Sequence, residues 1–305
     1  SYTTWFMTAL RGRGFSLRAL TFPPQAVFVK GFLDARNRFD FCPRNLDTGA
    51  HGQAAEGAML QRTFVHFPGI GLRRERRLWQ AGVRTWSECL AAPASGRALG
   101  ASWGSVRAQA AESSQAYARG DWAYFERRLP PEHKWRVYGD LAGDALFLDI
   151  ETDGGSDGGA ITLIGTFDGR AMKTFVRGRN LDEAAAEIER HALLVTFNGA
   201  CFDLPMIRSL FPGAAGRHLH VDLRYPLRRL GYWGGLKAIE RQLGLARSEA
   251  TRGLTGWDAV RLWQAFCGGS REALALLEAY NAEDVLNLKP LMEFAFQSCS
   301  STLTE

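Results

Sequence analysis

Three short segments place acidic side chains at spacings that suit metal chemistry. The first, Asp149-Ile-Glu151, ends the apolar run Ala145–Ile150, which predicts a strand. Because strand side chains alternate, both carboxylates project from one face. Two anions this close repel each other unless a cation lies between them. Solvated acids at a strand end have the same spacing, so this segment alone leaves both interpretations open.

The other two segments each add one acid. In Asn198–Pro205 an apolar strand leads into a helix, and Asp203 stands at the junction. Asp203 either caps the helix, with Pro205 in the first turn, or directs its carboxylate over the sheet. Further along, Tyr280 and Asp284 are four residues apart and share one face of a predicted helix. Taken alone, they also suit a hydrogen-bonded surface pair.

The elements that must position these acids alternate between strands and helices. We expect five strands, at 145–150, 160–167, 172–176, 193–197 and 218–223. We expect helices at 181–191, 204–210, 236–243, 257–266 and 271–296. Three strands in succession, followed by strands that alternate with helices, predict an α/β domain with a mixed five-stranded sheet flanked by helices.

The chain before this domain is organised differently. We divide it into a leader, residues 1–58, and a small helical region, residues 59–143, and we assign residues 144–305 to the α/β domain. The leader shows no sustained helical or strand period. Our hypothesis is that Met59 is the physiological start and that the leader is a disordered arm or lies upstream of the true start.

An arginine-rich turn lies near the start of the helical region. The run Phe67-Pro-Gly-Ile-Gly71 precedes four arginines and resembles the turn of a helix-hairpin-helix. Glycines there let backbone N–H groups approach a phosphate, and arginines add positive charge. We therefore take Arg73, Arg74 and Arg77 as candidate substrate-binding residues. A purely structural turn remains the alternative.

Composition and charge limit the class of protein. The 305 residues are 46% hydrophobic and 23% charged, as in globular proteins, and no apolar run reaches the ~20 residues of a membrane helix. Five widely spaced cysteines without a CxxC pair favour a reducing cytoplasm over a disulfide or zinc framework. We expect a cytoplasmic protein, and the sequence indicates neither a membrane nor an obligate protein partner.

Charge is divided unevenly along the chain. Residues 1–140 carry a net charge of +9, and residues 141–305 carry −4, within a total of +5. This division suggests that one half holds nucleic acid and the other holds metal. A solvated basic surface is the alternative explanation.

Together, the three acidic segments resemble the DEDD exonuclease superfamily. The order is Asp-x-Glu on the first strand, Asn-x-x-x-Phe-Asp at a later strand-to-helix turn and Tyr-x-x-x-Asp on a late helix. With the segments His220–Leu223 and Gly235–Glu240 between the last two motifs, the chain looks most like the YprB-like ribonuclease H-like domain. The resemblance implies a ribonuclease H-like fold, the tyrosine subtype and metal-dependent 3′–5′ exonuclease activity on DNA or RNA.

The resemblance also implies roles for individual residues. Asp149, Glu151, Asp203 and Asp284 would bind two divalent ions, Mg²⁺ or Mn²⁺, and Tyr280 would orient the attacking water. Two such ions about 4 Å apart activate the water and stabilise the leaving oxygen, and hard cations prefer carboxylate oxygens.

Two further residues have weaker assignments. Asn198 either holds the second motif or touches substrate. Asp222, at the end of the fifth strand, either supports a metal ligand or makes a loop hydrogen bond.

Two other functions stay open at this stage. One is a structure-specific or RNA-directed nuclease on the same fold. The other is a nucleic-acid binding module without catalysis, in which the basic half of the chain does the binding. The complete set of four acids and the tyrosine counts against the second alternative.

Overall fold

The computed structural model describes residues 58–92, 103–155, 159–214, 216 and 218–304. The predicted leader lies outside this part of the chain, apart from Ala58. Within it, no helix is both long enough and apolar enough to cross a membrane.

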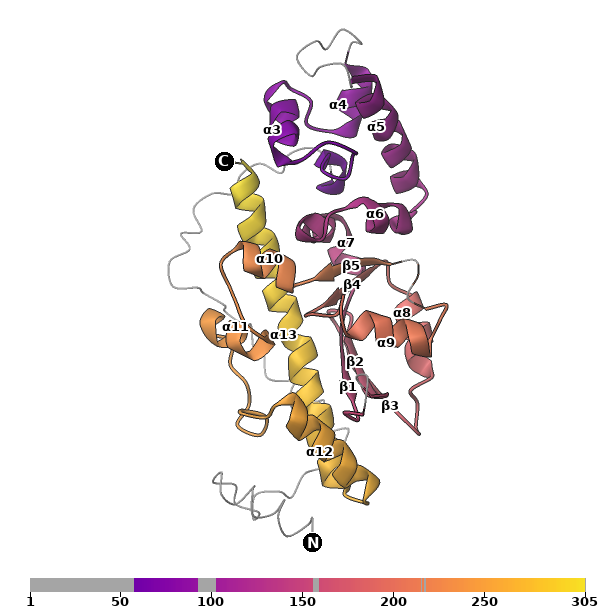
Figure 1. The fold of residues 1–305 in the computed structure, drawn as a ribbon, viewed down its shortest axis with the longest axis vertical. Coiled ribbons are helices and arrows are strands. Elements are labelled where there is room, and N and C mark those ends of the chain that lie inside the picture. Colours follow the sequence, from indigo (N-terminus) through magenta and orange to yellow (C-terminus); the bar gives the residue numbers. More distant parts are fainter. Residues whose placement is uncertain (1–57, 93–102, 156–158, 215, 217, 305) are drawn as a thin grey trace. The chain divides into compact units, whose positions relative to one another are not determined.

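A five-stranded mixed sheet forms the centre of the second half of the chain (Figure 1). Its strands are β1 (Ala145–Thr152), β2 (Ile161–Phe167), β3 (Met172–Val176), β4 (Leu193–Thr196) and β5 (Leu219–Asp222). Their order is β3-β2-β1-β4-β5. β2 is antiparallel to both β1 and β3, whereas β1, β4 and β5 are parallel. The predicted mixed sheet of five strands is confirmed.

The alternation of β1 gives the sheet two different faces. Leu146, Leu148 and Ile150 pack into one core with α8 (Glu183–Glu189) and α9 (Asp203–Leu210). Ala145 and Phe147 face the opposite core, which contains the long helix α13 (Arg271–Thr304). The next residues on this second face are Asp149 and Glu151, so the period of the strand carries both carboxylates toward α13.

The remaining helices of this half are α10 (Arg224–Arg229), α11 (Leu236–Leu243) and α12 (Gly256–Cys267). Helices α11 and α12 agree closely with their predicted ranges. Helix α10 was not predicted, and α13 continues eight residues beyond the expected end at Phe296, to Thr304. Its last turns remain helical because Cys299 and Leu303 are buried in the same core as β5.

The predicted small helical region precedes the sheet. Its α-helices are α3 (Leu72–Gln80), α4 (Trp86–Ala91), α5 (Trp103–Ala118), α6 (Trp122–Arg128) and α7 (Tyr138–Leu141). Short 3-10 helices occupy Leu60–Arg62, Pro131–Val137 and Ala142–Asp144. Trp86, Phe125 and Trp135 of this region belong to the same continuous hydrophobic core as Leu219 of β5 and Leu291 of α13. The helical region therefore packs against the edge strand β5 and against α13.

A fully buried ion pair holds the helical region together. Arg136 donates two hydrogen bonds, of 2.8 and 2.9 Å, to the carboxylate of Glu75, and both side chains are 0% exposed. The same carboxylate accepts the backbone N–H groups of Phe64 and Val65, at 2.7 and 3.2 Å. Glu75 thus links α3, the turn before it and the 3-10 helix that leads toward the sheet.

We expect Glu75→Gln to lower the free energy of unfolding by about 3–5 kcal/mol, because it leaves the Arg136 guanidinium buried without its counter-ion. Chemical denaturation followed by circular dichroism measures this loss. Glu112→Gln is the matched control, since the Glu112–Arg128 pair is exposed, at 47% and 34%, and should change stability by less than about 1 kcal/mol. Equal losses in the two variants would contradict the role of the buried pair.

Candidate metal centre

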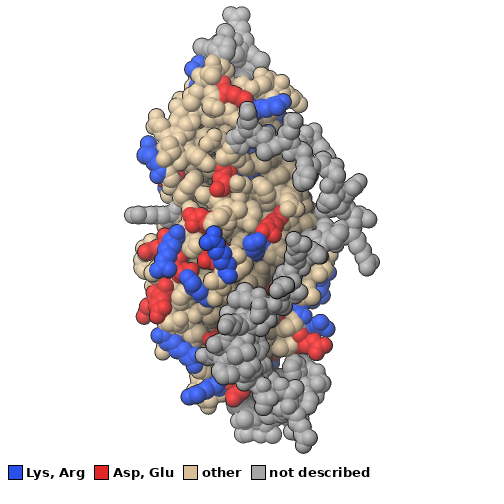
Figure 2. Space-filling model, turned by 180° about the vertical axis from the view of Figure 1, so that it is seen from behind, with Lys and Arg blue, Asp and Glu red and all other residues tan. Residues whose placement is uncertain are grey.

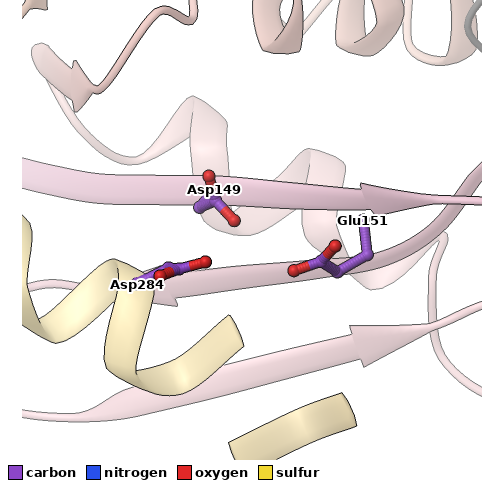
Figure 3. Close-up of side chains that lie close together, drawn as sticks. All are labelled: Asp149, Glu151 and Asp284. Atoms are coloured by element: carbon purple, nitrogen blue, oxygen red, sulfur yellow. The ribbon is translucent and has the colours of Figure 1, made fainter. Parts of the chain in front are cut away.

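Three carboxylates from two elements meet on the α13 face of the sheet. Asp149 and Glu151 come from β1 and Asp284 comes from α13, and one oxygen of each lies within 4.8 Å of the others. The carboxylates of Glu151 and Asp284 point toward each other across the gap between strand and helix (Figure 3). Glu151 and Asp284 are buried, and Asp149 is partly buried. More than 130 residues separate Asp284 from the two acids of β1 in the sequence, and the packing of α13 on β1 brings them together.

The turn that precedes Asp203 is built by side chains of the second motif and β5. Asn198 has a φ of 67°, a left-handed conformation that asparagine tolerates better than most residues. The carboxylate of Asp222 accepts the backbone N–H groups of Asn198, Ala200 and Arg224, at 2.8, 3.2 and 3.0 Å. Asp222 therefore makes the loop hydrogen bonds that were one of its two predicted roles, and it fixes the path of the chain into α9.

Asp203 is the first residue of α9 and is buried. Of its two predicted roles, the one as N-cap is wrong: the N-cap position belongs to Phe202, and no side chain caps the helix. Burial raises the pKa of Asp203 to about 7, and Asp222 adds to the rise, while the backbone N–H of Ile150 opposes it. Asp203 in turn raises the pKa values of Asp149 and Glu151, so this fourth carboxylate lies near the two acids of β1.

Burial and mutual repulsion disfavour charge on the acids of β1. The pKa of Asp149 lies well above its usual range, because of burial first and then because of Asp203, Asp284 and Glu151. Burial, followed by the charge of Asp284, raises the pKa of Glu151 to about 8. These carboxylates are held together by the fold against their own electrostatics, as in sites that bind cations.

Two cationic side chains from outside the sheet contact Asp284, one of the clustered acids. The Nζ atom of Lys237, on α11, lies 3.7 Å from Asp284 and contacts the hydroxyl of Tyr280. Arg247, in the loop after α11, pairs with the other oxygen of Asp284. Arg247 is itself held by the buried Glu240 through two hydrogen bonds of 2.6 and 2.7 Å. Both cations lower the pKa of Asp284, which burial raises.

A buried amide ties the two acids of β1 to α13. Asn281 is 0% exposed and donates from Nδ2 to the carboxylate of Asp149 at 2.9 Å. It also lowers the pKa of Glu151, which burial raises. Gly165, opposite Asp149 on β2, makes this contact possible, because a Cβ atom there would lie 1.8 Å from Asn281 Oδ1.

Lys237, Arg247 and Asn281 were not singled out from the sequence. Lys237 lies inside the segment Gly235–Glu240, and Asn281 lies inside the Tyr-x-x-x-Asp motif, directly after Tyr280. Arg247 lies in no motif, so only its contacts with Glu240 and Asp284 reveal it.

Tyr280 lies on α13 one turn before Asp284 and is buried, at 3% exposed. Its hydroxyl contacts Lys237 Nζ. Burial raises its pKa, and the charges of Asp284, Glu151 and Asp149 raise it further, so the phenol stays protonated at neutral pH. A neutral hydroxyl close to three carboxylates can donate a hydrogen bond to a water molecule or a substrate oxygen.

The candidate substrate-binding arginines lie in the helical region. Arg73, Arg74 and Arg77 are exposed on α3, whose first turn follows the positive-φ residue Gly69. Arg74 donates to the carbonyl of Gly69 at 2.8 Å, so one arginine braces the turn itself. Asn198, the other candidate, contacts Arg224 through its side-chain oxygen.

A family model and a solved structure are similar to this chain. The sequence model of the RNase H superfamily matches residues 146–296. A family B DNA polymerase from the hyperthermophilic archaeon Pyrobaculum calidifontis is similar in structure with a TM-score of 0.40 and 16% sequence identity, over 49% of this chain and 24% of the polymerase chain. No curated protein matches the chain. The family match and the mixed sheet with its flanking helices identify the fold as ribonuclease H-like.

The donor set fits a hard divalent cation. Asp149, Glu151 and Asp284 supply only carboxylate oxygens, which Mg²⁺ and Mn²⁺ prefer over nitrogen and sulfur. The raised carboxylate pKa values also suit a cation, because a bound cation would offset the burial and repulsion that disfavour the charged carboxylates.

The raised pKa of Glu151 predicts a pH-dependent stability without metal. Folded Glu151 keeps its proton up to about pH 8, whereas the unfolded side chain loses it near 4.5. The folded state therefore binds more protons between these values, so wild-type stability falls as pH rises through this window. Glu151→Gln removes the titration, and we expect its stability relative to the wild type to increase from pH 5 to pH 8 by about 3 kcal/mol at most.

Denaturation curves in a metal chelator at several pH values measure this difference. Comparing the two proteins cancels the buried histidines His66, His133 and His220, whose pKa values burial lowers to about 3. A difference that stays constant from pH 5 to pH 8 would show that Glu151 titrates normally.

Proposed function

We propose that the chain is a divalent-metal-dependent nuclease that removes nucleotides from the 3′ end of a nucleic acid. The observation that carries the proposal is the group of three carboxylates, from Asp149, Glu151 and Asp284, held close together on a ribonuclease H-like sheet, with Asp203 near enough to raise the pKa of Asp149 and with Tyr280 beside them. The match to the RNase H superfamily supports a nuclease in general. The 3′–5′ polarity rests on the resemblance of the three motifs to the DEDD exonucleases.

In the proposed reaction, a water oxygen bonds to phosphorus while the bond from phosphorus to the 3′ oxygen breaks. The products are a 5′-mononucleotide and a strand shortened by one residue that ends in a 3′-hydroxyl. Asp149, Glu151, Asp203 and Asp284 hold two divalent ions. When bound, these ions lower the pKa of water and stabilise the leaving oxygen.

The other residues position the reactants. Tyr280 donates its protonated hydroxyl to the attacking water, and Lys237 holds that hydroxyl in place. Asn281 orients Asp149 through its amide. Asp222 fixes the turn that carries Asp203 and Asn198, and Asn198 contacts the substrate strand. Arg73, Arg74 and Arg77 on α3 bind phosphates farther along the nucleic acid.

Labelled oligonucleotides test the proposal directly. The panel contains single- and double-stranded DNA and RNA, labelled at either end, with Mg²⁺ or Mn²⁺. Stepwise shortening from the 3′ end supports the exonuclease. Cleavage only at junctions or only in RNA supports a structure-specific or RNA-directed nuclease. Binding without any cleavage supports a non-catalytic binding module.

Loss of one metal ligand should abolish cleavage without unfolding the protein. We expect Asp149→Asn and Asp284→Asn to cleave less than about 1% as fast as the wild type, because a site with one carboxylate fewer binds the ions more weakly. The melting temperature of Asp149→Asn without metal should hold or rise, since one repelling charge is gone, whereas Asp284→Asn also loses its ion pairs with Lys237 and Arg247. Calorimetric titration with Mn²⁺ should show weaker binding, and wild-type cleavage by both variants would refute the metal assignment.

Removing the tyrosine hydroxyl should slow the reaction but leave it measurable. Tyr280→Phe keeps the ring and all four carboxylates and loses the hydrogen bond to the attacking water. Positioning of this kind is worth about 10²–10⁴-fold, so we expect kcat to fall by that factor with metal affinity nearly unchanged. Single-turnover rates at saturating substrate decide the question. A wild-type rate would reduce Tyr280 to a core residue.

The exposed arginines of α3 should control the salt dependence of binding. Reversing Arg73, Arg74 and Arg77 to Glu removes phosphate contacts, so we expect weaker binding and a shallower slope of log affinity against log salt concentration. Fluorescence anisotropy across a salt series measures the slope. Metal affinity should not change, and an unchanged slope would make the turn purely structural.

A further inference from the structure

The turn between α10 and α11 exposes a large aromatic side chain. Trp233 is 59% exposed. Two glycines with positive φ flank the Tyr232–Trp233 pair, Gly231 at 91° and Gly234 at 118°. Only glycine adopts such angles without strain, so the backbone is shaped to turn here. Exposing an indole ring to water costs free energy, and nothing in the packing of the core requires this one to point outward.

One face of the exposed ring contacts a cation, and the backbone and the neighbouring residue are also fixed by contacts. The guanidinium of Arg228 lies over the ring, 4.6 Å from its centroid. The carbonyl of Trp233 accepts a hydrogen bond of 3.0 Å from Gln242. The neighbouring Tyr232 packs edge-on against Phe294 of α13, with ring centroids 5.4 Å apart. A rigid ring with a cation over one face and water on the other is suited to stacking against a flat partner.

The surrounding segment is basic, although it lies in the acidic half of the chain. Residues 224–252 carry seven Lys or Arg and two Glu, whereas residues 141–305 as a whole have a net charge of −4. Two of the seven, Lys237 and Arg247, reach the carboxylates of the metal centre. On the face shown in Figure 2, by contrast, basic and acidic side chains intermingle among the described residues. The chain segment that carries Trp233 therefore also supplies two cations to the carboxylates.

We propose that residues 224–252 bind the single strand that enters the metal centre, and that Trp233 stacks on one of its bases. This inference rests on the proposed function and states which residues next to the carboxylates bind the substrate strand. Nucleic acid fits both features of the segment, because its phosphates pair with arginines and its bases are flat and aromatic. Tryptophan and arginine also occur together in protein–protein contacts, so the experiment below measures oligomeric state as well as nucleic-acid binding.

The test measures binding apart from cleavage. Full-length protein carrying Asp149→Asn is titrated, in a chelator, into fluorescent single-stranded oligonucleotides of DNA and RNA. Stacking by one aromatic side chain is worth about 5- to 100-fold in affinity. We therefore expect Trp233→Ala to weaken binding by such a factor and Trp233→Phe to retain most of it. Trp257→Ala is the matched control, because Trp257 is 72% exposed but lies outside the basic segment, and it should bind as the parent does.

A second substrate separates stacking from charge. On an abasic oligonucleotide of equal length, which keeps the phosphates, the Trp233→Ala and parent proteins should bind alike. Equal affinity of the two proteins for the normal oligonucleotide, or an equal loss in Trp257→Ala, would overturn the inference. So would a change of oligomeric state on Trp233→Ala without any change in binding, which would assign the ring to a protein contact.

The outcome is separable from that of the proposed function. If the wild-type protein binds strands through Trp233 but cleaves none, the nuclease proposal fails and the stacking site stands. If it cleaves and Trp233→Ala binds normally, the nuclease proposal stands and the stacking site fails. A wild-type protein that binds no nucleic acid refutes both.

Discussion

Repulsion among Asp149, Glu151, Asp203 and Asp284 is the constraint around which the second half of the chain is arranged. Each of the four has a raised pKa, with burial as the main cause. Without metal, part of the charge is offset by Lys237 and Arg247, which contact Asp284 from outside the sheet. The fold thus maintains an arrangement that would be unfavourable in water, and such an arrangement is useful where a divalent cation and a phosphate must meet.

Ordinary packing supplies the force that holds these acids together. Phe147 and its neighbours on the odd face of β1 share a core with Val285, Leu288 and Leu291 of α13, and the acids lie beside this core. The strand register shifts between Glu151 and Thr152, so the regular ladder of β1 and β2 breaks at the site. The apolar core shared by β1 and α13 stabilises the packing of the helix on the strand against the repulsion between the acids.

The basic and acidic halves of the chain are less separate in structure and in charge than their net charges suggest. The basic helical region shares its hydrophobic core with β5 and α13, so it packs as part of the same body as the sheet. The acidic half contains its own basic segment, residues 224–252, whose cations reach the carboxylates. Positive charge is thus available both beside the metal centre and on the exposed arginines of α3.

The sequence by itself determined the five strands and most helices of the second half of the chain, although not α10. Local patterns also fix faces, because the alternation of β1 sets the face of Asp149 and Glu151, and a four-residue spacing puts Tyr280 and Asp284 on one helical face. The choice of the acids as metal ligands came from the resemblance of the three motifs to a known family. Only the tertiary structure decided what surrounds them. Arg247 meets Asp284, and Gly165 leaves room for Asn281, through contacts between residues far apart in the chain. The predicted alternative in which Asp203 caps α9 was wrong for the same reason: the N-cap position falls on Phe202, and a sequence does not show contacts such as the one between Asp203 and Ile150 of the distant strand β1.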